Sequence, residues 1–476
     1  MIVGLSIVVL FVLLAAGISI AISLASSGIF GLLLLRGPDI TGSVIAGTSY
    51  TAVASGALLV VPMFVLMGMF TLHSGIAEHL FAVASRVLKW LPGGLGIATV
   101  FSAAGFGAIC GSSLATVATL GPTCITEMMR HGYKRSFASA IVAVSGTLAV
   151  LIPPSIILIL YGVITGESIG TLLIAGIIPG IISAVVLGAL IAVRAMRSET
   201  LISPANSQEF AVVQGHNASS VGTGVTGAEQ SSSVAVMTMP DDQEHVGSRT
   251  ENPSWVSVVY SVGGISVLFA IVIGGLYTGI FTPTESATVG AFAALILLFV
   301  SSGGRPRRFG VLVKESLFDT VSLNSMIFLI LVGAGIFSFF LVSAGVPSAL
   351  ARAVVDLPLP PTAIVLLLLL FLVPLGMFLD SISLLVITVP LVYGPITALG
   401  FDGIWLGILV VKLIELGMVT PPVGMNAYVA AGTVRGLSIE EVFRGIVPFY
   451  LADFILVALF FIFPQVVTWL PNIMAG

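Results

Sequence analysis

Two pairs of adjacent prolines interrupt long apolar stretches of the sequence, at "VLIPPSI" (150–156) and "MVTPPVGMN" (418–426). Each proline deletes a backbone N–H and clashes with the preceding helical turn, at a cost of about 3 kcal/mol or more. The carbonyls that lose their donors become free oxygen ligands, which suit a hard cation such as Na⁺. The sequence therefore predicts two cation sites at helix breaks. The alternative is that both proline pairs only kink helices for packing.

Hydroxyl groups near the breaks strengthen the cation interpretation. Two short polar segments, "GSSLAT" and "DSIS", stand in apolar surroundings and read as the tips of helical hairpins. They and the second break offer hydroxyl oxygens from Ser112, Ser113, Ser381, Ser383 and Thr420.

Composition decides the environment in which these residues work. Hydrophobic residues make up 57% of the 476 and charged residues only 8%, whereas a soluble domain has roughly 25% charged residues. Continuous apolar runs indicate an all-α polytopic membrane protein, because a β-barrel needs alternating strands. No Lys or Arg precedes Arg36, so the opening apolar stretch is expected to remain as membrane structure. Cys110 and Cys124 lack metal spacing and are interpreted as small core residues.

One segment differs from the rest of the chain. Residues 198–254 are rich in Ser, Gly, Thr and acids, which predicts a disordered cytoplasmic linker rather than a ligand domain. The linker separates two membrane halves, 1–197 and 255–476.

The two halves share a set of landmarks in the same order. The paired residues are 268 or 269 positions apart: Pro92 and Pro360, Gly107 and Gly376, Ser112 and Ser381, Gly132 and Gly400, Pro153 and Pro421. This spacing indicates an internal repeat. Each half is expected to hold a re-entrant hairpin (about 93–129 and 361–398) followed by a broken helix (about 136–164 and 403–431).

Charges predict that the repeats have opposite orientations in the membrane. Basic residues flank the first hairpin, namely Arg86, Lys89, Arg130, Lys134 and Arg135. The matching positions of the second half carry Asp356 and Asp402. Under the positive-inside rule, the first hairpin enters from the cytoplasm and the second from outside.

Several of these stretches together resemble one family, the large membrane subunit of tripartite ATP-independent periplasmic (TRAP) transporters. They are "GSSLATVATLGP", "HGYKRSFA", "IPPSIILILYG", "GIFTPTESA", "GMFLDSISLLVITVP" and "ELGMVTPPVGMN". The resemblance implies an elevator-type importer with a scaffold and a transport domain, driven by sodium, in the bacterial inner membrane. It implies three partners: a small four-helix membrane subunit, a periplasmic substrate-binding protein and an organic acid such as a C4-dicarboxylate or sialic acid. Na⁺ would be the coupling ion, with no cofactor and no nucleic acid.

The resemblance also implies ligands for two sodium sites. The first would use Ser112 and Ser113 with carbonyls near Ala149, Ile152 and Pro154, although the family usually has Gly where Ala149 stands. The second would use Ser381, Ser383, Gly417, Thr420 and Pro422. The substrate would lie between the tips, with Asp380 and Asn426 as candidate contacts.

The remaining polar residues can each be interpreted as structural as well as functional. Asp380 is either a functional acid or a helix cap. Glu415 follows Lys412 by three residues, which favours a local ion pair over a proton relay. Glu285 is expected to cap a turn or contact a partner. His73 and His79 are interpreted as part of an interfacial helix rather than as metal ligands.

Two rival functions remain on sequence grounds. An intramembrane enzyme is a remote alternative, because no H-E-x-x-H and no G-x-S-G with a partnering histidine is present. A stand-alone sodium–dicarboxylate carrier would share the hairpins and sodium sites but would need no binding protein.

Overall fold

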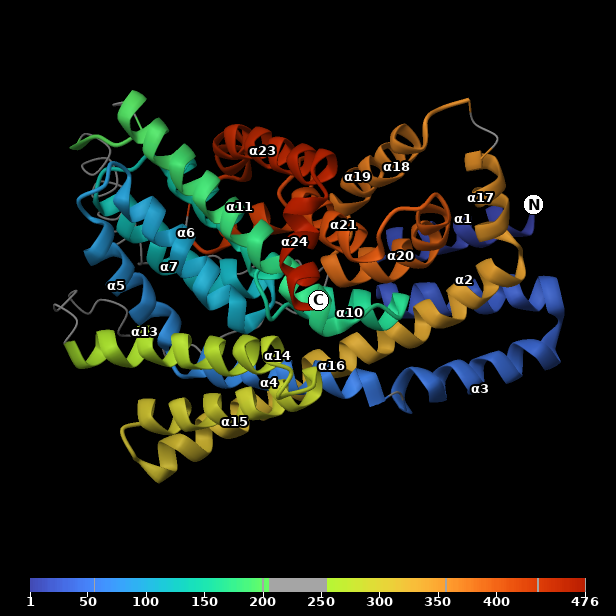
Figure 1. Ribbon diagram of the computed structural model, residues 1–476, viewed down its shortest axis with the longest axis horizontal. Coiled ribbons are helices and arrows are strands. Elements are labelled where there is room, and N and C mark those ends of the chain that lie inside the picture. The colour runs from blue at the N-terminus through green and yellow to red at the C-terminus, as the bar shows by residue number, and fades with distance from the viewer. Residues whose placement is uncertain (55, 199–200, 205–254, 356–357, 435, 476) are drawn as a thin grey trace, which may run out of the picture.

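The computed structural model describes residues 1–54, 56–198, 201–204, 255–355, 358–434 and 436–475. The predicted linker 198–254 lies almost wholly outside these ranges, as does Asp356. Every regular element in the described ranges is a helix, with one isolated β-bridge between Tyr133 and Ile202. The all-α prediction is therefore confirmed (Figure 1).

The helices before the linker are α1 (Ile2–Ala15), α2 (Ile20–Arg36), α3 (Pro38–Ala54), α4 (Val60–His73), α5 (Ile76–Leu88), α6 (Gly94–Cys110), α7 (Ser113–Arg130), α8 (Arg135–Gly146), α9 (Leu148–Leu151), α10 (Ile156–Thr165) and α11 (Ile169–Arg197). A 3₁₀ turn, η1 (Gly56–Leu59), precedes α4.

The helices after the linker are α13 (Trp255–Phe269), α14 (Gly275–Tyr277), α15 (Pro283–Ser301), α16 (Pro306–Ser343), α17 (Val346–Val355), α18 (Pro361–Leu370), α19 (Leu372–Gly376), α20 (Ser381–Ala398), α21 (Gly403–Met418), α22 (Met425–Gly432), α23 (Ile439–Ile462) and α24 (Gln465–Ala475). A π-helical turn, η2 (Ala270–Gly274), joins α13 to α14.

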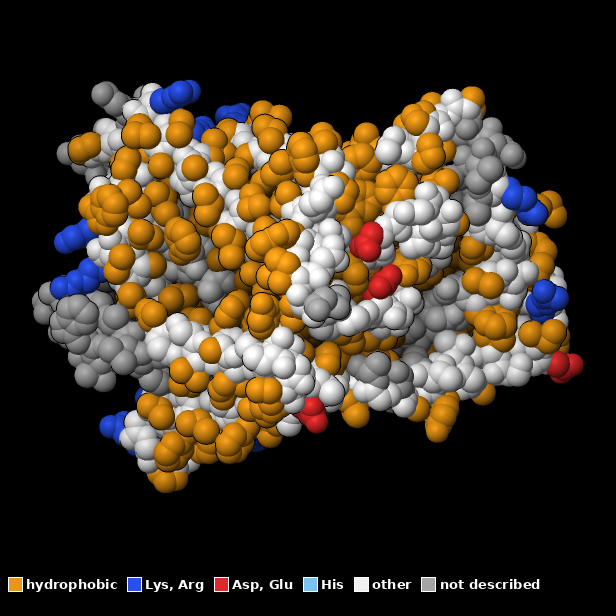
Figure 2. Space-filling model, viewed as in Figure 1, with side chains coloured by type: hydrophobic (Ala, Val, Ile, Leu, Met, Phe, Trp, Pro, Cys, Tyr) orange, Lys and Arg blue, Asp and Glu red, His pale blue; other side chains and the backbone are white. Residues whose placement is uncertain are grey.

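The surface is that of a protein that faces lipid. Within the described residues, five helices are long and apolar enough to cross a membrane: α11, α15, α16, α20 and α23. Figure 2 shows hydrophobic side chains over most of one face, with Lys and Arg gathered toward its left and right edges. Large apolar side chains such as Phe318, Phe292 and Ile455 are exposed. So much exposed apolar surface is expected in a bilayer and not in water.

A layer of long helices fills the lower half of the view in Figure 1, where α16 lies beside α2 and α4, and α15 packs on α4. Small residues bring these helices together. A Cβ added to Gly28 would lie 2.8 Å from the Cα of Phe337, and one added to Gly333 would lie 2.3 Å from the carbonyl oxygen of Ala21. Close backbone approach at small residues is the usual packing device of helices in lipid.

A second group of helices, α6 to α8 with α22 and α23, buries its own apolar cluster. Aromatic rings are stacked at its centre, with Phe137 lying 6.0 Å from Tyr133 and 6.2 Å from Phe449 between ring centroids. Cys110 and Cys124 are buried in this cluster as free thiols, which confirms that they are core residues. The site described below lies where this group meets α19 to α21.

Candidate functional site

The first polar tip is a tight turn between α6 and α7. Gly111 adopts a left-handed conformation (φ +64°), and Ser112 then caps α7 by accepting a hydrogen bond from the N–H of Ala115 at 3.3 Å. A Cβ on Gly111 would lie 3.3 Å from the carbonyl oxygen of Pro154. The tip therefore rests against the first proline break.

The first break separates α8 and α9 from α10, and the two segments meet at an angle of 42°. Ile152 is extended (φ −81°, ψ 123°), and Ser155 caps α10 by accepting from Leu158 N–H at 3.3 Å. Pro153 and Pro154 have no N–H, so the carbonyls of Ala149 and Val150 cannot receive the i+4 hydrogen bonds of a continuous helix. These two carbonyls therefore lack helical donors, and the carbonyl that lies against the tip is that of Pro154. The peptide bond between the prolines is cis.

The second tip connects α19 to α20, and Asp380 is its cap. The Asp380 carboxylate accepts hydrogen bonds from the N–H groups of Ile382 and Ser383, both at 3.1 Å, and from the Ser383 hydroxyl. The capping interpretation of Asp380 is confirmed. The Ser383 hydroxyl donates its hydrogen to the Asp380 carboxylate, so the lone pairs of its oxygen remain available as ligands.

The second break follows α21 and contacts the second tip directly. Gly424, which is left-handed (φ +58°), donates its N–H to the carbonyl of Met377 at 3.3 Å. The Thr420 hydroxyl donates to the Leu416 carbonyl at 2.6 Å, and its N–H donates to the Gly417 carbonyl at 3.0 Å. The peptide bond between Pro421 and Pro422 is also cis.

In each hairpin, one glycine lies so close to the broken helix that a side chain at its position would not fit. A Cβ on Gly107 would lie 2.3 Å from the Cβ of Ala149, and one on Gly376 would lie 3.1 Å from the Cα of Gly417. The two crossings lie at positions of matching spacing in the two halves, because 417 − 149 = 268 and 376 − 107 = 269. Position 149, where the family usually has Gly, therefore contacts the first hairpin. Ala149 fits there only because Gly107 faces it.

The prediction of an ion pair between Lys412 and Glu415 is wrong. The ammonium of Lys412 lies 2.6 Å from a carboxylate oxygen of Asp453 on α23, and both side chains are buried. Glu415 instead accepts a hydrogen bond of 2.7 Å from the hydroxyl of Ser381 on the second tip. Residues three apart on a helix can face different neighbours when the helix is packed on several sides, and tertiary partners then replace the local pair.

Asn426 lies next to the first tip although it belongs to the second half of the chain. Its amide nitrogen lies 3.7 Å from the position of a Cβ on Gly146, and the carbonyl oxygen of Ser113 lies 3.1 Å from the same position. The side chain is fully buried, and neither of its polar atoms has a hydrogen-bond partner among the described residues. A buried amide without partners is costly, so Asn426 keeps its place as a candidate contact for a polar ligand.

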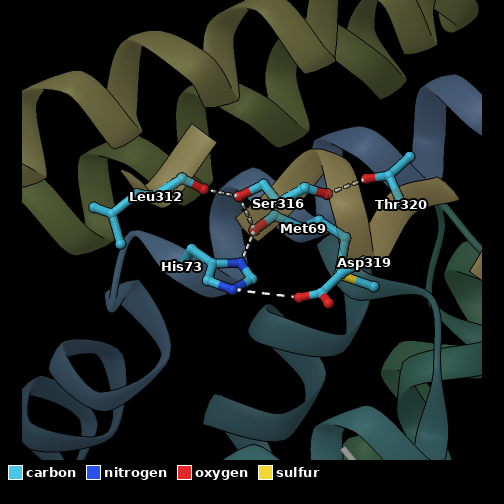
Figure 3. A network of polar contacts seen from close by, with 6 residues as sticks. All are labelled: Met69, His73, Leu312, Ser316, Asp319 and Thr320. Atoms are coloured by element: carbon cyan, nitrogen blue, oxygen red, sulfur yellow. Dashed lines mark hydrogen bonds and ion pairs between the residues drawn. The ribbon is translucent and has the colours of Figure 1, made fainter. Parts of the chain in front are cut away.

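His73 and Glu285 have structural partners away from the tips. Figure 3 shows His73 between α4 and α16, with Nδ1 3.0 Å from the Met69 carbonyl and Nε2 3.4 Å from Asp319. The described residues contain no group of three or more His, Cys, Asp or Glu that could hold a metal ion. Glu285 forms a capping box with Thr282 at the start of α15, which confirms the interpretation as a cap.

Comparison with known proteins decides the family. The family model described as the DctM component of tripartite ATP-independent periplasmic transporters matches residues 7–466. The chain belongs to this family. The resemblance inferred from the motifs is confirmed.

Two DctM-family relatives and one solved structure are similar along nearly the whole chain. The C4-dicarboxylate TRAP transporter large permease protein DctM of Vibrio cholerae serotype O1 is 30% identical, over 98% of this chain and 96% of the relative. The sialic acid TRAP transporter large permease protein SiaM of the same organism is 28% identical, over 98% and 97%. The YdaH transporter of Alcanivorax borkumensis shares the fold, with a TM-score of 0.60 at 13% identity over 91% of this chain and 90% of that one.

The DctM relatives are permease subunits of transporters and not enzymes. The intramembrane enzyme considered as a remote alternative is therefore excluded. The chain is a polytopic transporter subunit of the TRAP large permease family.

Proposed function

We propose that this permease subunit imports a small organic acid in symport with sodium. The observation that carries the proposal is that each proline break lies against its own polar tip: Gly111 against Pro154, and Met377 against Gly424. Carbonyls of the breaks, among them those of Ala149 and Val150 that lack helical donors, would then meet tip hydroxyls in one place. Clusters of neutral oxygens of this kind suit Na⁺, and broken helices near the midplane are where transporters with inverted repeats bind their ions.

The two sodium sites would use the ligands assigned from the family motifs. At the first site these are the tip serines Ser112 and Ser113 and the carbonyls of Ala149, Ile152 and Pro154. At the second site they are Ser381, Ser383, Gly417, Thr420 and Pro422. The matched crossings at Gly107 and Gly376 support treating the two sites as equivalents in an inverted repeat.

The organic acid would bind between the tips. Asn426 offers a buried amide that lacks partners, and the positive ends of α7 and α20 favour an anionic group. Asp380 is committed to its cap, so we assign it to holding the tip rather than to contacting the acid. A C4-dicarboxylate, sialic acid or a similar carboxylate fits this arrangement, as the names of the relatives suggest.

The proposal includes partners and a location. The family name describes a tripartite system, so we propose that a periplasmic binding protein delivers the acid and that a small four-helix membrane subunit completes the complex. The location would be the bacterial inner membrane. The hairpins and broken helices would move as an elevator against a scaffold that includes α2, α4, α15 and α16.

Uptake into proteoliposomes tests the proposal. The purified complex should accumulate substrate when sodium and the binding protein are present outside, and uptake should stop when potassium replaces sodium. Equal accumulation in potassium would refute sodium coupling. Uptake that needs sodium but not the binding protein would favour the stand-alone carrier instead.

A further inference from the structure

The end of α5 presents a basic and aromatic surface that faces away from the protein. One face of this helix is buried and packs on α6. Its last turn and the two residues that follow expose Arg86, Val87, Lys89 and Trp90. The exposed fractions of the two apolar side chains are 76% for Trp90 and 61% for Val87. A large ring and an aliphatic side chain therefore lie beside two cations on the outside of the molecule.

The two cations of α5 have no acidic partner in the described part of the chain. Arg86 and Lys89 take part in none of the ion pairs found there. The sequence contains no Asp or Glu between positions 79 and 126. The next acid along the chain, Glu127 on α7, lies 3.7 Å from the guanidinium of Arg130. The positive charge at the end of α5 is thus available to an anion from outside the protein.

Further basic groups lie on α11, against which the loop after α5 rests. A Cβ on Gly93 would lie 3.0 Å from the Cβ of Ala195. On the same turn, the guanidinium of Arg194 lies 5.3 Å from the centroid of the Phe137 ring, and its Nη1 is buried without a hydrogen-bond partner among the described residues. Arg197 ends the helix. Lys and Arg side chains gather at the left end of the view in Figure 2, where α5 and the end of α11 lie in Figure 1.

The residue types on this surface suit a lipid headgroup better than a protein partner. Lys is depleted at protein–protein interfaces. Trp at the level of the headgroups, with Lys and Arg beside it, is typical of the membrane–water boundary. Basic residues next to a membrane span attract anionic lipids. We propose that Arg86, Lys89, Trp90 and Arg194 form a surface that binds the headgroups of anionic phospholipids in the cytoplasmic leaflet, the side that the positive-inside rule gives to these charges.

The position of α5 in the chain gives such binding a consequence for transport. The helix joins α4 to α6, the first arm of the hairpin. Left-handed glycines stand at both of its ends, Gly75 and Gly93, each with φ +73°. A lipid-bound α5 would stay at the membrane surface while the hairpin changes its depth, and the turns at the two glycines would absorb the difference. This consequence rests on the proposed elevator movement, whereas lipid binding itself does not.

Fluorescence quenching by brominated lipids tests the binding without any transport assay. The purified full-length chain is reconstituted in phosphatidylcholine vesicles that contain an equal mole fraction of either brominated phosphatidylglycerol or brominated phosphatidylcholine. The chain has four Trp, so the signal of Trp90 is taken as the difference between the wild type and W90F. Brominated phosphatidylglycerol should quench Trp90 more strongly. Higher salt should reduce this preference, because it screens exposed charges.

Charge variants identify the residues that hold the anionic lipid. R86Q/K89Q should lower the preference by about fivefold for each residue, the factor that corresponds to about 1 kcal/mol. R352Q is the matched control, because α17 joins α16 to α18 as α5 joins α4 to α6, and it should leave the quenching of Trp90 unchanged. The side chains of Arg86 and Lys89 are exposed, so the unfolding temperature should not fall. The single variants R86Q and K89Q decide the question if the double variant does not fold.

Uptake measurements then test the consequence for transport. The wild-type complex should import substrate faster in vesicles that contain phosphatidylglycerol, and R86Q/K89Q should lose this difference. An equal rate in both kinds of vesicle would refute the role of the lipid in movement.

The quenching results stand apart from the test of sodium symport, since they need neither sodium nor substrate. Equal quenching of Trp90 by the two lipids would overturn the inference, as would a preference that survives in R86Q/K89Q. An absence of quenching by either lipid would also overturn it, because protein would then cover the surface. Uptake that is independent of sodium would refute the proposed function and leave the lipid surface standing.

Discussion

The substitution of Gly107 by Ala probes the closest contact between a hairpin and a broken helix. The added Cβ would lie 2.3 Å from the Cβ and 2.4 Å from the Cα of Ala149. Carbon atoms prefer separations of about 3.5–4.0 Å, so α6 and α9 must part by roughly 1 Å. Overpacking of this kind costs about 1–3 kcal/mol. Part of that cost is offset because Ala stabilises a helix by roughly 0.5–1 kcal/mol relative to Gly.

Gly107→Ala should therefore lower the unfolding temperature and weaken sodium binding together. Ala149 lies three residues before Ile152, so a displacement of α9 reaches the carbonyls of the first proposed site. We expect the sodium half-saturation of uptake to rise by about tenfold, which corresponds to roughly 1.4 kcal/mol. The assays are thermal unfolding of the purified complex and uptake measured against sodium concentration.

Two further variants make the result decisive. Gly105 lies on the same helix, but a Cβ there meets only the end of the flexible Leu80 side chain at 3.0 Å. Gly105→Ala should be neutral or stabilising. Adding Ala149→Gly to Gly107→Ala should restore both stability and sodium affinity, because it recreates the small facing residue that Gly417 supplies in the second half. Equal stability of the two glycine variants would refute the contact, and a destabilised Gly107→Ala with normal sodium affinity would refute its link to the site.

The remaining predictions concern other buried or capping groups. Lys412→Met should destabilise the protein by about 3–5 kcal/mol because Asp453 is left buried without a partner, and Asp453→Leu added to it should recover much of the loss in thermal unfolding. Asn426→Ala should raise the KM for substrate without lowering the unfolding temperature, since its amide atoms have no partners among the described residues to lose. Thr282→Ala removes the cap of α15 and should cost about 0.5–2 kcal/mol by the same unfolding assay.

The sequence identifies the breaks and turns of this fold because their chemistry is local. Proline removes a donor wherever it stands, glycine allows a left-handed turn, and Asp or Ser before an apolar run caps a helix. Asp380 and Glu285 both take part in helix caps, which was one of the two roles that the sequence left open for each. The positions at which α6, α18, α20 and α21 begin follow from the same signals.

The partners of buried charges could not be found in this way. Lys412 bonds to a residue 41 positions away, and Glu415 bonds to one 34 positions away. The local spacing of three residues between Lys412 and Glu415 pointed to the wrong pair. The only available signal was Asp453, an acid within an otherwise apolar span, because an ionisable group in a membrane helix requires a partner.

The two halves of the chain share their backbone features but not their charged residues, and the two sets of features suit different functions. The shared features are backbone features: the paired prolines, and the glycines that let each hairpin arm lie against its broken helix. They could supply carbonyl sites twice without any charge. The charged residues of α21 have no such duplicates, because positions 144 and 147 of the first half hold Val144 and Thr147 where the second has Lys412 and Glu415. The unduplicated carboxylate of Glu415 accepts a hydrogen bond from Ser381 of the second tip, so charge distinguishes the two proposed sites that the backbone features make alike.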